Sequence, residues 1–205
     1  AGYYILIPKF GYQAAMIRIS WLELLQDIQS CKSCALHENI QNKVPGQGNP
    51  NARLMIIGEG PGAQEDREGL AFVGPAGQLL TRMLKAIDLE RDEVYIANVV
   101  KCRPPGNRVP SKEEADACKP HLRAQFALVQ PRIILLMGST ALQQVLSPDM
   151  RITSARGKWV ERKGIFFLPT FHPAALLRDE GKKRDAWHDM QMVRDKLTEL
   201  EESSP

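Results

Sequence analysis

The chain has 205 residues, of which 43% are hydrophobic, 25% are charged and 6% are aromatic, and its formal net charge is +3. This composition is that of a globular protein and excludes collagen, coiled coil and wholesale disorder. A charge so close to neutral permits contact with nucleic acid without indicating it, and four cysteines are too few for a disulfide scaffold of this length.

The first fifteen residues are set apart from the expected fold. Pro8 and Lys9 interrupt their apolar run before it is long enough to cross a bilayer. No basic flank precedes the run, as a secretory signal would require, so we expect a cytoplasmic protein without membrane contact. Met16 is a candidate natural start. We therefore expect residues 1–15 to be a leader or an expression remnant, and residues 16–205 to form a single domain.

Beyond this segment the pattern alternates between helix and strand. Ser20 is a good N-cap residue, and the apolar spacing after it predicts a helix that runs to Cys31. Short apolar runs predict four buried strands, at residues 54–57, 94–100, 133–137 and 165–168. Further helices are predicted at residues 76–89, 111–129 and 184–200. The second of these opens with a capping box at Ser111 and Glu114.

Strands that alternate with helices over short connections predict an α/β fold. We expect a three-layer sandwich with a central, mostly parallel four-stranded sheet and helices on both faces. In such sheets ligands bind outside the carboxyl ends of the strands. Polar or glycine-rich residues follow all four predicted strands, at residues 58–62, 98, 138–139 and 171–173. The four strand ends should therefore converge on one crevice.

The four cysteines have an informative spacing. Cys31 and Cys34 form a C-x-x-C motif, whereas Cys102 and Cys118 lie far downstream. Buried free thiols, a redox pair and two disulfides are alternatives, although a cytosolic setting disfavours disulfides and the redox motif belongs to a thioredoxin-like fold. A single four-cysteine metal site would fasten the first helix and the 102–118 segment to the sheet. Spacing alone does not distinguish zinc from an iron–sulfur cluster.

Two of the strand ends carry candidate functional groups. The loop from Gly58 to Gly62 lacks the lysine of a phosphate-binding loop, which disfavours a small-molecule nucleotide-binding protein. Its glycines would let a flat ligand approach the backbone, or they form only a tight turn. His172, which Pro173 restricts, is either structural or catalytic. Basic residues form either a solvated surface or a phosphate-binding rim around the crevice: Lys101, Arg103, Arg108, Arg156, Lys158, Arg162, Lys163, Arg178 and residues 182–184.

Several segments, taken together and in order, resemble the family 4 uracil-DNA glycosylases. They are residues 58–62 with Glu65 and Asp66, 71–80, 96–108, 156–159, 171–173 and 176–178. The resemblance extends from Ile17 to Leu197 and includes all four cysteines. It implies a hydrolase of base excision repair that cleaves the N-glycosidic bond of deoxyuridine in DNA, releases uracil and leaves an abasic site. It also implies that Cys31, Cys34, Cys102 and Cys118 ligate a structural 4Fe–4S cluster.

The resemblance assigns roles to residues of the crevice. Phe72 would stack on a base flipped out of the duplex, and Asn98 would pair with the O4 and N3 edge of uracil and so reject cytosine. His172 would reach uracil O2 and stabilise the departing anion.

The resemblance also places the loop after the first strand at the base. The backbone around Glu59, Gly60 and Pro61 would contact uracil. Glu59 and Glu65 would orient water or stabilise the cationic sugar, and Glu65 alternatively shapes the pocket wall against the methyl group of thymine. No aspartate follows Glu59, where family 1 enzymes carry their water-activating acid, so we expect catalysis to rest chiefly on electrostatic stabilisation of a dissociated transition state.

The expected partner is uracil-containing DNA, bound by Arg108, Lys158 and Arg178. A monomer is expected, with a processivity clamp as a candidate partner. The sequence departs from the family at residues 70–71 and 174–175, the latter beside the loop expected to wedge into DNA. No basic insertion follows Arg108, which disfavours the related variant that becomes trapped on abasic DNA. The alternative function is a non-catalytic iron–sulfur module of the same fold that binds DNA or assists replication.

Overall fold

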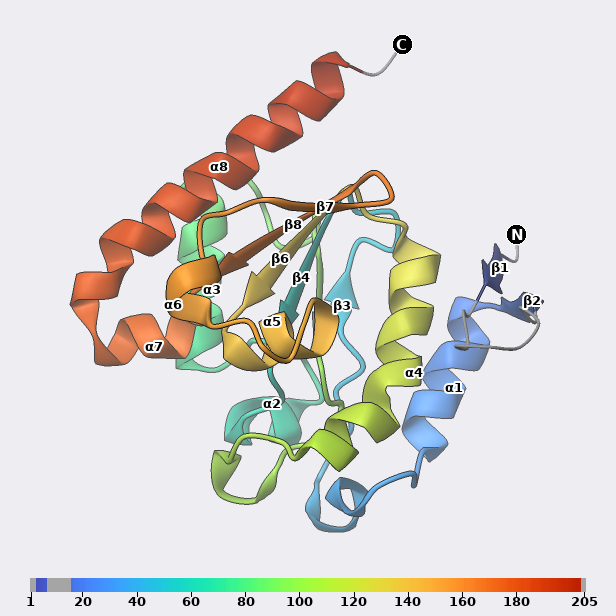
Figure 1. The fold of residues 1–205 in the computed structure, drawn as a ribbon. Helices are drawn as coiled ribbons and strands as arrows, with labels where there is room; N and C mark the ends of the chain where they lie inside the picture. Colours follow the sequence, from blue (N-terminus) through green and yellow to red (C-terminus); the bar gives the residue numbers. More distant parts are fainter. Residues whose placement is uncertain (1–2, 7–15, 204–205) are drawn as a thin grey trace.

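A computed structural model describes residues 3–6 and 16–203 of the chain (Figure 1). Most of the first fifteen residues, and with them the expectation of a leader or expression remnant, therefore lies outside the described residues. The described part of that segment, strand β1 (Tyr3–Leu6), pairs antiparallel with β2 (Met16–Ile19).

The other strands are β3 (Gln47–Gly48), β4 (Leu54–Gly58), β5 (Tyr95–Asn98), β6 (Ile133–Met137), β7 (Val160–Arg162) and β8 (Ile165–Thr170). The α-helices are α1 (Trp21–Ser30), α2 (Ala63–Glu68), α3 (Pro75–Lys85), α4 (Lys112–Val129), α5 (Ser139–Val145), α6 (Ile152–Ala155), α7 (Pro173–Arg178) and α8 (Lys183–Glu202). Short 3-10 turns are η1 (Ala35–Asn39), η2 (Pro105–Asn107) and η3 (Glu180–Lys182). No described helix is long and apolar enough to span a membrane.

The central sheet has six strands in the order β3-β5-β4-β6-β8-β7. The four predicted strands form its centre, where β5, β4, β6 and β8 run parallel to one another. The prediction of a four-stranded sheet was incomplete, because β3 and β7 extend the two edges in antiparallel pairing and make the sheet mixed. These edge strands have two and three residues, so neither contains an apolar run that the sequence pattern could reveal.

Helices cover both faces of this sheet, as predicted. Alternate residues of a strand enter different cores: Met55 and Ile57 pack with the residues of α4 and α5, whereas Leu54 and Ile56 pack with those of α3 and α8. Because both faces are covered, every residue of β4 and β6 is buried. Figure 1 shows the two helical layers on either side of the strands.

Local capping signals position the predicted helices well. Ser20 and Ser111 each form a capping box, with Glu23 and Glu114, at the starts of α1 and α4. Helix α3 ends at Lys85, short of the predicted residue 89, because the backbone leaves the helix and reaches a positive φ at Asp88. The short helices α2, α5, α6 and α7 were not among the predicted elements.

The parallel strands all end at the same edge of the sheet. In Figure 1 the arrowheads of β4, β6 and β8 point to the side where α5, α6 and α7 lie. Residues that follow β4, β5, β6 and β8 are therefore gathered on that side, which is where the sequence predicts a crevice.

Candidate active site

Gly58, the last residue of β4, brings two of the predicted side chains together. A Cβ atom at Gly58 would lie 2.5 Å from Cζ of Phe72 and 2.6 Å from Oδ1 of Asn98. Real Cβ atoms do not come so close to other atoms, so only glycine leaves room for both groups. The aromatic ring and the amide therefore meet beside the end of β4.

Asn98 carries a buried acceptor that nothing in the described chain satisfies. The residue ends β5 and is 2% exposed, and its Oδ1 atom has no hydrogen-bond partner among the described residues. An unpaired buried acceptor costs about 1–3 kcal/mol. A ligand that offers an N–H group to Oδ1 would remove that cost. The amide thus suits a flat ligand whose edge carries a donor.

A buried lysine supports the backbone of Asn98. Nζ of Lys101 donates to the carbonyl oxygen of Asn98 at 2.7 Å and to Oε1 of Gln125 at 2.6 Å. Nε2 of Gln125 in turn donates to the carbonyl of Pro45 and to the hydroxyl of Tyr95. Burial lowers the pKa of Lys101 to about 8. Lys101 is 2% exposed and its ammonium group is bonded within the protein, so it does not belong to the predicted basic rim.

His172 stands opposite Phe72, and its ring is held in one proton form. The two ring centroids are 5.6 Å apart with an interplanar angle of 30°. The backbone N–H of Ala174 donates to Nδ1 of His172 at 3.1 Å, so the neutral imidazole carries its proton on Nε2. Burial first, and then the positive charge of Arg178, lower the pKa of His172 to about 4. The side chain is therefore a neutral N–H donor at physiological pH.

The end of β6 leaves room for His172 in this place. Gly138, which follows β6, has φ of 92°, a value that favours glycine. A Cβ atom there would lie 3.1 Å from Cβ of His172, so a larger residue would crowd the histidine. Three of the predicted residues, Phe72, Asn98 and His172, are thus gathered at the carboxyl edge of the sheet.

The two predicted acids have different surroundings. Both carboxylate oxygens of Glu65 accept backbone hydrogen bonds, from Gly62 at 3.1 Å, Val73 at 3.0 Å and Gly74 at 2.8 Å. Glu59 uses one oxygen, which accepts a hydrogen bond from the hydroxyl of Thr140 at 2.5 Å. Glu65 is therefore engaged with the backbone on both oxygens, whereas the other oxygen of Glu59 accepts no hydrogen bond from the described residues.

The loop that contains Gly60 and Pro61 packs tightly behind the site. Pro61 is buried, and a Cβ atom at Gly60 would lie 2.8 Å from Cγ2 of Val100. The backbone N–H groups of Val99 and Val100 donate to the carbonyls of Gly58 and Glu59 at 3.0 and 3.2 Å. The loop is thereby fixed against the segment that follows β5.

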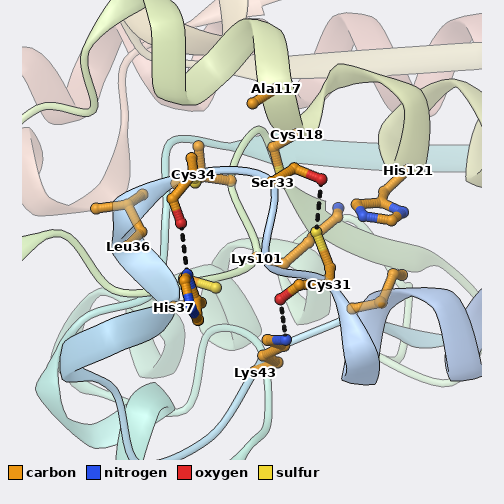
Figure 2. A pocket seen from close by; sticks show the side chains of 13 residues that line it. Cys31, Ser33, Cys34, Leu36, His37, Lys43, Lys101, Ala117, Cys118 and His121 are labelled. Carbon is orange, nitrogen blue, oxygen red and sulfur yellow. Dashed lines mark hydrogen bonds between the residues drawn. The ribbon is translucent and has the colours of Figure 1, made fainter.

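All four cysteines line a single pocket (Figure 2). Cys31 ends α1, Cys34 precedes η1, Cys102 follows β5 and Cys118 lies in α4. None of them forms a disulfide. The alternative of two disulfides is therefore not the arrangement in this structure.

Polar side chains line the same pocket as the cysteines. Lys43 donates to the carbonyl of Cys31, and Nδ1 of His37 lies 2.7 Å from the carbonyl of Cys34 (Figure 2). Burial, followed by the nearby Cys118, raises the pKa of Cys102 to about 12. In the described chain no three His, Cys, Asp or Glu side chains are grouped closely enough to hold one metal ion. Four cysteine thiols form the donor set of zinc sites and of iron–sulfur sites alike.

The three predicted DNA-binding residues come from separate elements. Arg178 ends α7 and is exposed, and Lys158 is exposed after α6. Arg108 is also exposed, but its guanidinium binds both carboxylate oxygens of Glu114 at 2.7 and 2.8 Å. No hydrogen bond, ion pair or ring contact among the described residues joins these three side chains.

Arg156, another member of the predicted basic rim, is largely buried in an ion pair. Its guanidinium binds Asp189, which is 0% exposed, and Oδ2 of Asp189 also accepts a hydrogen bond from the hydroxyl of Thr170 at 2.7 Å. Asp189 therefore joins α8 to the end of β8 through Thr170, and to Arg156 at the end of α6. Sequence reasoning missed Asp189, Thr140 and Gln125, because their partners lie 19 to 81 residues away in the chain.

Known proteins with similar sequences cover most of the chain. Residues 45–191 match the uracil DNA glycosylase superfamily. The chain is 42% identical over 182 residues to a type-4 uracil-DNA glycosylase of Sulfurisphaera tokodaii, which covers 84% of this chain and 83% of that protein. It is 44% identical over 160 residues to the type-4 uracil-DNA glycosylase of Thermotoga maritima, with 76% and 82% covered. A third, from Pyrobaculum aerophilum, is 39% identical over 173 residues, with 80% and 88% covered.

Proposed function

The chain belongs to the uracil-DNA glycosylase superfamily and is a DNA repair glycosylase that removes uracil, and from this premise we propose how its own residues perform the reaction. The observation that carries the proposal is the meeting of Phe72, Asn98 and His172 at the end of the sheet. A flipped base placed there would find a stacking ring, an amide and an N–H donor. Extrusion from the duplex is required because these groups cannot reach a base inside the stack.

Base recognition is assigned to Asn98. Uracil presents an N3–H donor beside the O4 acceptor, so its N3–H would donate to the unpartnered Oδ1 and its O4 would accept from Nδ2. Cytosine reverses this pattern, with an acceptor at N3 and an amino group at C4. Cytosine would leave buried polar groups unpaired on both sides, which is the kind of mismatch that gives strong discrimination.

Departure of the base is assigned to His172. As the N-glycosidic bond breaks, negative charge develops on uracil and positive charge on the sugar. The Nε2–H group of a neutral imidazole would donate to uracil O2 and stabilise the anion. The hydrogen bond from Ala174 to Nδ1 supports this role, because it keeps the proton on the opposite nitrogen.

The acids divide into two roles. We assign to Glu59 the orientation of the attacking water or the stabilisation of the cationic sugar, since Thr140 occupies only one of its oxygens. The backbone contacts of Glu65 favour a positioning role for the loop that carries Phe72. Direct participation of Glu65 in catalysis stays a prediction. Gly60 and Pro61 would line the base on the strand side.

We further propose that Cys31, Cys34, Cys102 and Cys118 hold a 4Fe–4S cluster. The four thiols fit such a group because they line one pocket without forming disulfides. When bound, the cluster would supply structural cross-linking rather than bond-breaking chemistry. The ligands come from the end of α1, the start of η1, the segment after β5 and the middle of α4, so together they would join these elements.

DNA contact is assigned to exposed basic side chains at the same edge. Arg178 ends α7, the helix that His172 caps, and Leu177 beside it is 47% exposed, as a wedging residue must be. Lys158 and Arg108 would add phosphate contacts. We also propose that the protein acts as a monomer in the cytoplasm. A processivity clamp stays a prediction.

Single-turnover excision on a uracil-containing oligonucleotide tests the proposed roles. His172→Ala and Asn98→Ala should each lose most of the excision rate, by about 100-fold or more, and still show absorbance near 400 nm from the cluster. The exposed residues His188 and Asn51 provide matched alanine controls that should not change the rate. Unchanged rates in the two site variants would contradict the residue assignment. DNA binding without any turnover by the wild type would favour the non-catalytic module instead.

A further inference from the structure

Phe72 holds its ring at the site through an unusual backbone conformation. Its φ is 53°, in the left-handed region, which bulky aromatic residues rarely adopt. The residue is 5% exposed and lies in the loop between α2 and α3. Such a conformation persists only where the surrounding structure enforces it. The groups that enforce it on Phe72 therefore influence where the ring lies.

Arg91 forms hydrogen bonds to the backbone of this loop. Its Nη1 donates to the carbonyl of Phe72 at 3.0 Å and its Nη2 to the carbonyl of Ala71 at 2.8 Å. Nη1 also contacts the hydroxyl of Thr81 on α3 at 3.3 Å. The guanidinium thus bridges two successive carbonyls, a geometry that its planar, forked arrangement of donors can satisfy.

Glu65 binds the same loop through the backbone N–H groups of the two residues that follow Phe72. Oε1 of Glu65 accepts from the backbone N–H of Val73 and of Gly74. Two carbonyls are therefore held by a cation, and the two N–H groups that follow are held by an anion. Each charge matches the polarity of the backbone groups that it binds.

Helix α3 closes the remaining side of the loop. A Cβ atom at Gly77 would lie 1.8 Å from the carbonyl oxygen of Phe72, so the loop rests directly on the helix backbone. The carbonyl of Phe72 consequently lies between Gly77 and the guanidinium of Arg91. With its carbonyl fixed there, the ring of Phe72 lies against the end of β4 and beside His172.

We propose that Arg91 is a positioning residue for uracil excision, which acts by holding Phe72 in the left-handed conformation that presents its ring to the flipped base. This inference rests on the stacking role of Phe72 in the proposed function. Arg91 itself lies outside the segments that pointed to the family, and it contacts the backbone rather than the base. Its effect on excision must therefore pass through the ring of Phe72.

A double-mutant cycle between Arg91 and Phe72 tests the inference. Arg91→Met should lower single-turnover excision of uracil by about 10–100-fold. The affinity for DNA that carries a tetrahydrofuran abasic site should stay within about twofold, because that DNA has no base to stack. Arg91→Lys should recover only part of the rate, since an ammonium lacks the fork that bridges both carbonyls. In a Phe72→Ala background, Arg91→Met should cause no further loss.

Arg82→Met is the matched control, because Arg82 is an exposed arginine of α3, and it should excise uracil at the wild-type rate. Thermal melting would show whether each variant folds, and Arg91→Lys, with and without Phe72→Ala, completes the cycle if Arg91→Met does not fold. Normal excision by Arg91→Met overturns the inference, as does a full additional loss in the Phe72→Ala background. Failure of the proposed function would look different, as a wild type that excises no uracil.

Discussion

The hydrogen bond between Ala174 and His172 has an electrostatic consequence for the folded protein. Protonation of Nδ1 would set two N–H donors against each other, and burial already opposes the charge. These effects agree with the pKa of His172 being lowered from 6.5 to about 4 by burial and by Arg178. Folding therefore favours the neutral imidazole.

The first prediction concerns stability as a function of pH. Between pH 6.5 and 4 the unfolded chain binds a proton at His172 that the folded chain does not, so stability should fall as the pH is lowered through this window. The loss should reach about 1–3 kcal/mol near pH 4 and vanish above pH 7. Urea unfolding of the wild type and of His172→Asn, which keeps a side-chain acceptor for Ala174, would measure it. Equal pH slopes in the two proteins would contradict the prediction.

A second prediction separates function from stability at Asn98. Its buried Oδ1 has no partner in the described chain, so Asn98→Ala removes an unsatisfied polar group as well as the proposed base contact. We expect excision to collapse while the melting temperature stays unchanged or rises. Differential scanning calorimetry alongside the excision assay would check this. A clear fall in melting temperature would mean that the amide has a structural partner.

At the scale of single elements, α4 joins a helix cap to a candidate DNA contact. Glu114 completes the capping box with Ser111 and also binds the guanidinium of Arg108 with both oxygens. If Arg108 binds a phosphate group, it must first release Glu114. Glu114 and a DNA phosphate group would therefore compete for one guanidinium.

The third prediction uses two substitutions at Glu114 to separate these effects. Glu114→Gln retains a capping group but removes the charge, so DNA should bind about 2–5-fold more tightly with little change in stability. Glu114→Ala also loses the cap and should cost about 1 kcal/mol of folding free energy. Fluorescence anisotropy and denaturant titration measure the two quantities. Identical DNA affinity of the wild type and Glu114→Gln would show that Arg108 does not bind DNA.

The elements also show what a sequence can and cannot specify. Buried parallel strands such as β4 and β6 were predictable because both of their faces are apolar, and α1 and α4 because a serine and a glutamate mark their starts. The edge strands β3 and β7 were not, because their pairing depends on neighbours in the sheet rather than on their own residues. The predicted end of α3 was approximate because the backbone leaves the helix after Lys85 and reaches a positive φ at Asp88.

The residues of the candidate site likewise divide into those that the sequence could identify and those that it could not. Phe72 was identified through the resemblance alone, and Asn98 and His172 also through their places at the ends of predicted strands. The structure brings all three together. Lys101 and Arg156 were predicted for the basic rim, yet they are buried against Gln125 and Asp189. Those partners lie 24 and 33 residues further along the chain, so a local pattern cannot show the pairing.

At the scale of the whole molecule, the cysteine pocket joins elements that are distant in sequence. The thiols come from the end of α1, the segment after β5 and the middle of α4, and the last of these covers one face of the sheet. Since Cys102 lies four residues after Asn98, the pocket and the base-reading amide share one short stretch of chain. Loss of the bound group should therefore disturb both stability and excision.

The fourth prediction is that Cys102→Ser lowers the melting temperature and abolishes the absorbance near 400 nm. The physical reason is that a lost ligand releases the tie between β5, α1 and α4, and bound metal groups stabilise a fold by their binding free energy. Lys32→Ala is a suitable control, because Lys32 is exposed between Cys31 and Cys34 and supplies no thiol. Brown colour and wild-type melting in Cys102→Ser would contradict the assignment, as would stoichiometric zinc in the active protein.

The short stretch from Asn98 to Cys102 also constrains how such a protein can evolve. Its residues Val99, Val100 and Lys101 are buried and bonded at both ends, so one inserted residue would displace either the amide or the thiol. Residues 105–109, only a few positions later, are exposed. Among relatives of this enzyme, insertions and deletions should therefore accumulate in residues 105–109. They should be rare between Asn98 and Cys102, because that segment fixes the distance between the amide and the thiol.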